Sequence, residues 1–155
     1  MAKATSEIRI NAPKEKVWEV LADFGGVAKW APPVQHSVST TEANSGVGTE
    51  RSCEVPGFGT VTERATEWQE GRRIGYDVKS DGPIKSAHNS FTLSPAGNET
   101  VVTIATDIEM SGSEADRIAM EGQLSQFIEV TLAGLKHYVE TGEPMPMPEA
   151  PATTK

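Results

Sequence analysis

The N-terminal segment constrains the fold of this chain more than any other part of the sequence. Residues 7–10 alternate polar and apolar side chains, which predicts a strand with one buried face. Asn11 can then cap a helix, and Pro13 suits the first helical turn. Apolar residues recur at helical spacing from there to Gly25, and residues 27–31 can form one more short turn. The segment therefore predicts a strand followed by two short helices.

Most of the chain after these helices reads as short strands. The strands are joined mainly by hairpin-length turns that contain Gly, Pro, Asn or Asp. Consecutive strands with such short connections pair antiparallel, as a meander. We predict six further strands, at residues 34–38, 49–55, 60–68, 73–79, 84–93 and 101–110.

A single long helix ends the predicted α+β fold. Ser113 is a suitable N-cap, acidic residues follow it, and Gly142 can close the helix. At ~1.5 Å per residue this helix would be roughly 40 Å long, enough to cross a small sheet. Gly122 and Gly134 inside it indicate either close packing against a strand or room for a ligand. A small sheet crossed by one long helix cannot close tightly everywhere, so we expect it to enclose a cavity.

The composition argues against several classes of partner. The net charge is −8 and the pI about 4.9, without a basic stripe, which argues against a nucleic-acid or anionic-membrane surface. No apolar run approaches the ~20 residues of a membrane span, and the N-terminus lacks the apolar core of a signal peptide. A single cysteine, Cys53, excludes an internal disulfide and fits a reducing compartment. We therefore expect a cytoplasmic protein, monomeric or a weak homodimer, with no nucleic-acid partner and no membrane insertion.

Sequence motifs for metal, phosphate or nucleophile chemistry are missing. The three histidines and one cysteine lack the spacing of metal ligands, and HxxxH and CxxC do not occur. The glycines of GFGTVTE lie in a predicted hairpin and not before a helix, so they do not form a phosphate loop. The motif GxSxG is also absent. We expect no metal and no cofactor.

Four segments carry a resemblance to a known superfamily: INAPKEKVWEVLADF, Trp30 to Pro32, GTVTERATEWQEGRRIGYDV and GLKHYVE. The chain resembles the polyketide cyclase/dehydrase-like members of the START-like (SRPBCC) superfamily, which also holds the birch pollen allergen family and the plant abscisic acid receptors. The resemblance covers residues from about 5 to 142. It implies a helix-grip fold, in which a seven-stranded curved antiparallel sheet wraps around a long C-terminal helix, with two short helices between the first two strands. We expect one such domain at residues 1–142 and a disordered, Pro-rich tail at 143–155.

The resemblance also implies a set of cavity residues. Some coincide with ligand-contacting positions of the abscisic acid receptors, and others lie where the last helix of the family faces the cavity. Residues 55–59 correspond in place to a Pro-containing gate of those receptors but lack its sequence. Trp30 is either a core side chain or one at the cavity mouth. The predicted ligand-binding residues are Trp30, His36, Arg51, Glu63, Tyr76, His88, Ser90, Phe127, Val130 and Gly134.

Strand alternation places two of these residues on apolar faces. His36 shares a predicted strand face with Val38, and Arg51 shares one with Cys53. An imidazole and a guanidinium that converge in a cavity would suit a carboxylate, phenolate or enolate oxygen. Two other interpretations remain for Arg51: it pairs with Glu63, or it points to solvent. Cys53 itself is expected to be a buried small apolar side chain.

The position of His88 also has two interpretations. Ser86, His88 and Ser90 share one face of a predicted strand, whereas Phe91 and Leu93 share the other. Either the polar set lines a cavity, or the apolar pair points inward and His88 is exposed. The family resemblance favours the first arrangement.

Three functions are consistent with this sequence. The favoured one is binding or carriage of a small hydrophobic molecule with a polar end, such as a lipid, polyketide or aromatic metabolite. The second is a polyketide cyclase or dehydratase, in which His36 or His88 moves a proton, Glu63 orients it and Arg51 stabilises an enolate. The third is a ligand-free interaction module with a filled cavity and an exposed apolar patch. Superfamily membership does not choose among them, because one fold serves many functions.

Overall fold

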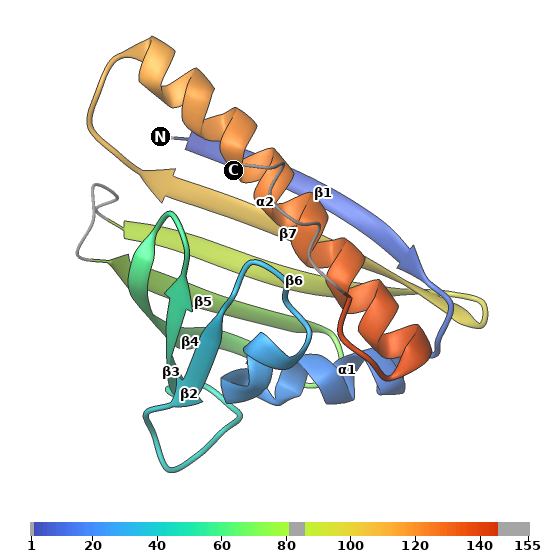
Figure 1. The fold of residues 1–155 in the computed structure, drawn as a ribbon. Coiled ribbons are helices and arrows are strands. Elements are labelled where there is room, and N and C mark those ends of the chain that lie inside the picture. The colour runs from blue at the N-terminus through green and yellow to red at the C-terminus, as the bar shows by residue number, and fades with distance from the viewer. Residues whose placement is uncertain (1, 81–85, 146–155) are drawn as a thin grey trace, which may run out of the picture.

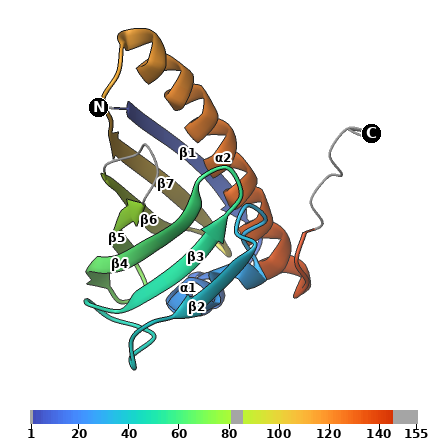
Figure 2. The ribbon, with the colours of Figure 1, turned by 60° about the vertical axis from the view of Figure 1, so that its left-hand side comes forward.

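The computed structural model describes residues 2–80 and 86–145. Within these residues a seven-stranded antiparallel sheet has the strand order β1-β7-β6-β5-β4-β3-β2, and a long helix runs beside β1 (Figure 1, Figure 2). The predicted helix-grip fold is confirmed. The elements are β1 (Ala2–Ile10), α1 (Lys14–Ala22), the 3₁₀ helix η1 (Phe24–Lys29), β2 (His36–Ser39), β3 (Glu50–Val55), β4 (Gly59–Gln69), β5 (Arg73–Ser80), β6 (Ser86–Ala96), β7 (Glu99–Glu109) and α2 (Glu114–Thr141).

The predicted strands are present, but some of their ends differ. β1 begins at Ala2 and not at residue 7, because it pairs with β7 along its whole length, as far as Ile10. The first two residues predicted for the strand at 84–93, and residues 146–155 of the predicted tail, lie outside the described residues. Strand ends therefore follow the partner strand rather than the local alternation pattern.

The first helix begins later than its predicted cap. Pro13 occupies the N-cap position of α1 with φ −69° and ψ 157°, and no side chain caps the helix there. The prediction that Asn11 caps this helix is wrong, because Asn11 lies two residues before the N-cap. The Asn11 backbone N–H instead donates to the Glu140 carboxylate on α2, at 2.7 Å.

Both predicted ends of α2 are confirmed. The Ser113 hydroxyl accepts a hydrogen bond from the Asp116 N–H at 3.2 Å, and the Asp116 carboxylate accepts one from the Ser113 N–H at 3.0 Å. Gly142 ends the helix with a left-handed φ of 82°, which glycine adopts without strain. Within the described part of the chain, neither this helix nor any other combines the length and apolar character needed to cross a membrane.

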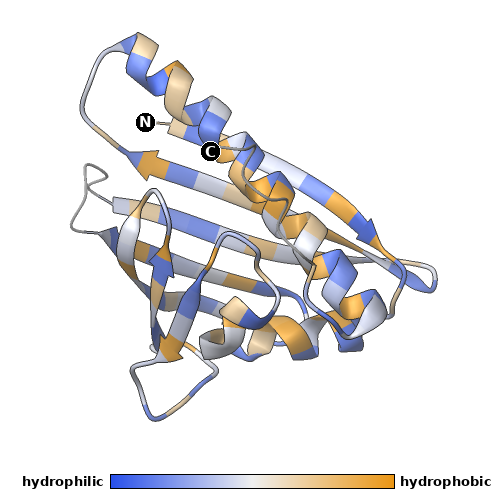
Figure 3. Cartoon of the chain, viewed as in Figure 1, coloured by the Kyte–Doolittle hydropathy of each residue, from blue (hydrophilic) through white to orange (hydrophobic). Residues whose placement is uncertain are grey.

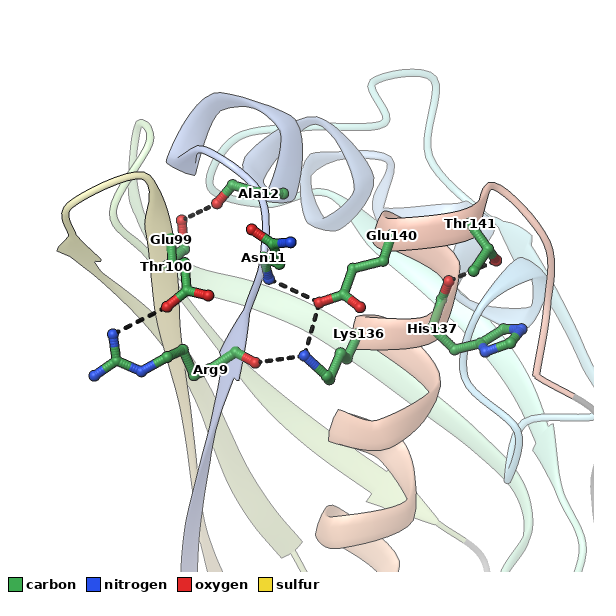
Figure 4. A network of polar contacts seen from close by, with 9 residues as sticks. All are labelled: Arg9, Asn11, Ala12, Glu99, Thr100, Lys136, His137, Glu140 and Thr141. Atoms are coloured by element: carbon green, nitrogen blue, oxygen red, sulfur yellow. Dashed lines mark hydrogen bonds and ion pairs between the residues drawn. The ribbon is translucent and has the colours of Figure 1, made fainter.

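Side chains of α2 hydrogen-bond to backbone groups of the edge strand β1 and the residue after it (Figure 4). Lys136 Nζ donates to the Arg9 carbonyl oxygen at 2.9 Å and to the Glu140 carboxylate at 2.7 Å. The same carboxylate accepts from the Asn11 N–H, so one ion pair satisfies two backbone groups. Edge strands expose unpaired backbone groups, and here α2 covers some of them.

Buried apolar residues of α2 and of the strands form one core, and Figure 3 marks apolar residues on all of these elements. Gly134 is buried where α2 passes residues 30–32. A Cβ atom at Gly134 would lie 2.6 Å from the Trp30 carbonyl oxygen and closer still to Pro32 Cδ. The glycine thus permits close packing, although against a loop and not against a strand. The largest fully buried side chains are Phe24, Ile10, Leu132, Leu135, Val17 and Val102.

Candidate ligand-binding cavity

The inner face of the sheet and the middle of α2 surround a cavity of about 100 Å³. Its wall is mostly apolar, and three of its residues come from α2. Glu63, Ser80, Asn89, Thr106 and the hydroxyl of Tyr76 supply the polar groups. The remaining lining residues are Val55, Phe58, Val61, Val78, Ala87, Phe91, Ile104, Ile108, Leu124, Phe127 and Ile128.

Strand alternation and one small side chain create this space. Ala87 on β6 lies in register between Val78 on β5 and Ile108 on β7. Because its side chain is only a methyl group, it leaves space between these two larger side chains. On another side of the cavity, Phe58 in the β3–β4 turn meets Phe127 of α2 edge-to-face, with ring centroids 5.6 Å apart. Both rings are partly exposed, which places them where the cavity approaches solvent.

A buried ion pair lies beside the cavity. Arg51 Nε donates to Glu63 Oε1 at 2.6 Å, and Arg51 Nη1 donates to the Phe24 carbonyl oxygen at 2.7 Å. The guanidinium carbon is 3.8 Å from the Phe24 ring centroid and 4.8 Å from that of Tyr76. Burial lowers the pKa of Arg51, but the Glu63 carboxylate outweighs this, so the pKa lies above its ordinary value. Of the three interpretations of Arg51, pairing with Glu63 is the one found.

Two other groups near this ion pair stay protonated at neutral pH. Burial raises the pKa of Cys53 to about 12, and the Glu63 carboxylate, whose Oε1 is 3.8 Å from Cys53 Sγ, adds to the rise. Burial also raises the pKa of Tyr76, again with a contribution from Glu63, whereas Arg51 and a hydrogen bond from Asn89 oppose it. Tyr76, which lines the cavity, therefore keeps a neutral O–H at neutral pH. Among the described residues, no cluster of three His, Cys, Asp or Glu side chains is arranged to hold a metal ion.

A second, much smaller cavity of about 10 Å³ lies on the other side of Tyr76. Its volume suffices for about one water molecule. Tyr76 and Phe91 line both cavities, and their rings stack with centroids 6.3 Å apart. Arg51 lines the small cavity and not the large one. The other residues of the small cavity are Leu21, Phe24, Trp30 and Ile74.

The sequence model of the family described as "Polyketide cyclase / dehydrase and lipid transport" matches residues 1–140. The chain belongs to this family. No curated protein matches the sequence. Solved structures with a similar fold include a protein from Thermobifida fusca (20% identity, 90% of this chain and 93% of that chain, TM-score 0.76). Others are the Zhui aromatase/cyclase of a Streptomyces species (19%, 89% and 93%, TM-score 0.75) and a START superfamily protein from Mycobacterium smegmatis (14%, 90% and 98%, TM-score 0.73).

Some residues expected from the superfamily resemblance do meet at the cavity. Glu63, Tyr76 and Phe127 line it. Trp30 is buried beside the smaller cavity and packs edge-to-face on Phe91, with ring centroids 6.1 Å apart, so it is a core side chain.

The prediction that His36 faces the interior is wrong. His36 and Val38 are both exposed on β2, and the alternate residue Ser37 points inward. The Ser37 hydroxyl donates to the Gly25 carbonyl oxygen at 2.9 Å and accepts from the Ala28 N–H at 3.0 Å. These hydrogen bonds to η1 hold the Ser37 side chain on the inner face of β2. His36, the preceding residue on the strand, therefore points its imidazole outward.

His88 and Ser90 also lie on the other face of the sheet from the cavity. Ala87 and Asn89 of β6 line the cavity, so the even-numbered residues of this strand point the opposite way. There His88 Nδ1 is 2.8 Å from Asp77 Oδ1 on β5, and both side chains are partly exposed. The interpretation with the apolar pair inward and His88 outside is therefore the correct one. Ser90 is buried, but it does not line the cavity.

Two predicted helix residues do not line the cavity, and most of the residues that do were not among the predicted ligand-binding residues. Val130 and Gly134 are absent from the cavity wall, since Gly134 packs on the loop after η1. Asn89, Thr106 and Phe58 contribute to it. Strand alternation could have identified Asn89 and Thr106, because each shares a strand face with apolar residues. Phe58 lies at the apolar tip of a turn, where alternation gives no direction.

Proposed function

We propose that this protein binds a small, mostly apolar molecule in the cavity between the sheet and α2. The observation that carries the proposal is a space of about 100 Å³ with an apolar wall and a few polar groups. Ligand sites in proteins have this composition, in which apolar side chains supply contact area and few polar groups orient the ligand. The lipid-transport part of the family description supports the same function.

The volume of the cavity limits the ligand to about one ring or a short chain. An apolar cavity of about 150 Å³ is known to hold benzene, so 100 Å³ suits a compact ligand. A larger molecule, such as a polyketide, requires Phe58 and Phe127 to separate, because their rings are in contact at the partly exposed side of the cavity.

The two alternative functions receive less support. A cyclase or dehydratase needs a group that transfers protons inside the cavity, and the two histidines expected to do so, His36 and His88, lie outside its wall. Glu63 is engaged by Arg51, and the raised pKa of Tyr76 makes its O–H a poor acid at neutral pH. An interaction module predicts a filled cavity, which the volume of about 100 Å³ argues against.

Filling the cavity tests this proposal. Ala87→Leu extends a side chain into the cavity from β6, whereas Ala105→Leu, on the neighbouring strand, lies outside the cavity wall and serves as the matched control. Toluene should raise the melting temperature of the wild type and of the control, because a ligand of the native state alone stabilises it. It should leave the melting temperature of Ala87→Leu unchanged. Equal responses from all three proteins, or none from the wild type, would contradict the proposal.

Native mass spectrometry of the purified protein provides an independent measurement. A retained small molecule that is released on denaturation would identify the chemical class of the ligand. The Ala87→Leu variant should retain less of it than the Ala105→Leu control. Equal retention by the two variants would place the ligand elsewhere.

A further inference from the structure

We propose that the cavity selects molecules whose polar end is a neutral hydroxyl group, an alcohol or a phenol, and discriminates against carboxylates. This inference rests on the proposed binding function and names the chemical class of its ligand. It reverses the expectation from the sequence, in which a histidine and an arginine would attract an anionic oxygen.

One buried hydrogen-bond acceptor at the cavity, Asn89 Oδ1, lacks a donor, and one carboxylate oxygen of Glu63 accepts no hydrogen bond from the described residues. Asn89 Oδ1 is a buried atom without a hydrogen-bond partner among the described residues, and Asn89 lines the cavity. Glu63 also lines it, and the hydrogen bonds to Glu63 from described residues, those from Arg51 Nε and Cys53 Sγ, go to Oε1. Its second carboxylate oxygen, Oε2, therefore remains to accept. A buried acceptor without a donor costs free energy, so a ligand that donates a hydrogen bond is favoured.

No described cationic side chain faces this space. Arg51 does not line the large cavity, and its Nε and Nη1 donate to Glu63 and to the Phe24 carbonyl oxygen. His88 is on the opposite face of the sheet, paired with Asp77. A ligand carboxylate would thus face the oxygens of Asn89 and Glu63 without a counter-charge from any described residue, which is unfavourable at low dielectric.

A neutral hydroxyl fits better than a cation as well. The charges of Arg51 and Glu63 cancel at a separation of 2.6 Å, so a buried ammonium group would be an unpaired charge. A hydroxyl group can donate one hydrogen bond and accept another. Next to the acceptors Asn89 and Glu63, the neutral O–H of Tyr76 is available as the matching donor.

Four probes of similar size separate these possibilities in the wild-type protein. They are phenol, its donor-free counterpart fluorobenzene, benzoate and benzylamine, each titrated at pH 7 by calorimetry or ligand-observed NMR. Phenol should bind roughly fivefold more tightly than fluorobenzene, the worth of one net hydrogen bond. Benzoate and benzylamine should bind at least tenfold more weakly than phenol, because each buries a charge without a partner.

Two matched variants locate the preference. Asn89→Leu keeps the approximate shape of the side chain but removes the acceptor, so the preference for phenol over fluorobenzene should fall roughly fivefold. Ser90→Ala removes a buried hydroxyl from the next residue, on the opposite face, and should leave the preference unchanged. A melting curve of each variant without ligand shows whether it is folded. The comparison of the four probes in the wild-type protein does not depend on these variants.

The outcomes distinguish failure of this inference from failure of the proposed function. If benzoate binds as tightly as phenol, if fluorobenzene binds as tightly as phenol, or if folded Asn89→Leu keeps the full preference, the hydroxyl selectivity is wrong while the cavity still binds ligands. If none of the four probes binds, fluorobenzene included, both the proposed function and the inference are overturned.

Discussion

Replacing Glu63 by alanine is expected to destabilise the protein by about 3 kcal/mol. The substitution leaves the Arg51 guanidinium, on a side chain 5% exposed, without its carboxylate. Removing one partner of a buried ion pair typically costs ~3–5 kcal/mol, because the other charge stays buried. Arg51 would keep the Phe24 carbonyl oxygen and the faces of two aromatic rings, which places the expected cost at the lower end of that range.

Urea unfolding followed by circular dichroism measures this cost, and the melting temperature should fall by roughly 6–12 °C for a domain of this size. Glu67→Ala is the matched control. It breaks a 2.7 Å pair with Arg73 whose side chains are 37% and 32% exposed, for which about 0–1 kcal/mol is expected. The double variant Arg51→Met/Glu63→Leu should be more stable than Glu63→Ala, because it buries no charge. A Glu63→Ala cost no larger than that of Glu67→Ala would refute this reasoning.

Three further predictions concern packing, acid stability and thiol reactivity. Gly134→Ala should lower the free energy of unfolding by ~1–3 kcal/mol, because the added methyl group clashes with the loop at 30–32. The control Gly122→Ala, at an exposed position with open space at its Cβ, should raise the free energy of unfolding by up to ~1 kcal/mol. A higher free energy of unfolding for Gly134→Ala would contradict the packing described. The hydrogen bond from Lys136, and then one from the β1–α1 connection, lower the pKa of Glu140 below the ordinary 4.5, so its stabilisation exists above that pH and is lost as the pH falls through the lowered pKa. The stability difference between wild type and Glu140→Gln, measured by urea unfolding at pH 7 and pH 3, should therefore be smaller at pH 3. An equal difference at the two pH values would contradict the stabilising role of the ionised Glu140 carboxylate. Cys53, 1% exposed and with a pKa of about 12, should react with a disulfide reagent only as fast as the protein unfolds, and rapid labelling of the native protein would disprove its burial.

Local sequence signals were sufficient for the order of elements and for several of their ends. Ser113 and Gly142 act within one turn of α2, so the residues that cap this helix are its own neighbours. Alternation along β5 and β7 likewise depends on the backbone of each strand alone. Asn11 shows the limit of such signals, because a good capping residue caps only if the helix begins immediately after it, and here the helix begins later.

Alternation predicts which residues share a face, but it does not say which face is covered. On β6 both arrangements satisfied the pattern, and the structure selects the one in which Asn89 and not His88 faces the cavity. On β2 the apolar residue Val38 suggested the wrong face, because a short strand beside η1 is held by the hydrogen bonds of Ser37 rather than by apolar burial. Candidate site residues on short or polar strands are therefore the least predictable from sequence.

Local patterns in the sequence were enough to predict a strand, two short helices, an antiparallel meander and one long capped helix, together with the family to which the chain belongs. These features depend on side-chain periodicity and on residues a few positions apart. Three features of the site became known only from the folded chain: Arg51 is neutralised by Glu63 and bound to the Phe24 carbonyl, both candidate histidines lie outside the cavity, and Asn89 lies at its wall. These outcomes depend on contacts between residues distant in the chain and on which face of each strand its neighbours cover, and neither is encoded in local periodicity.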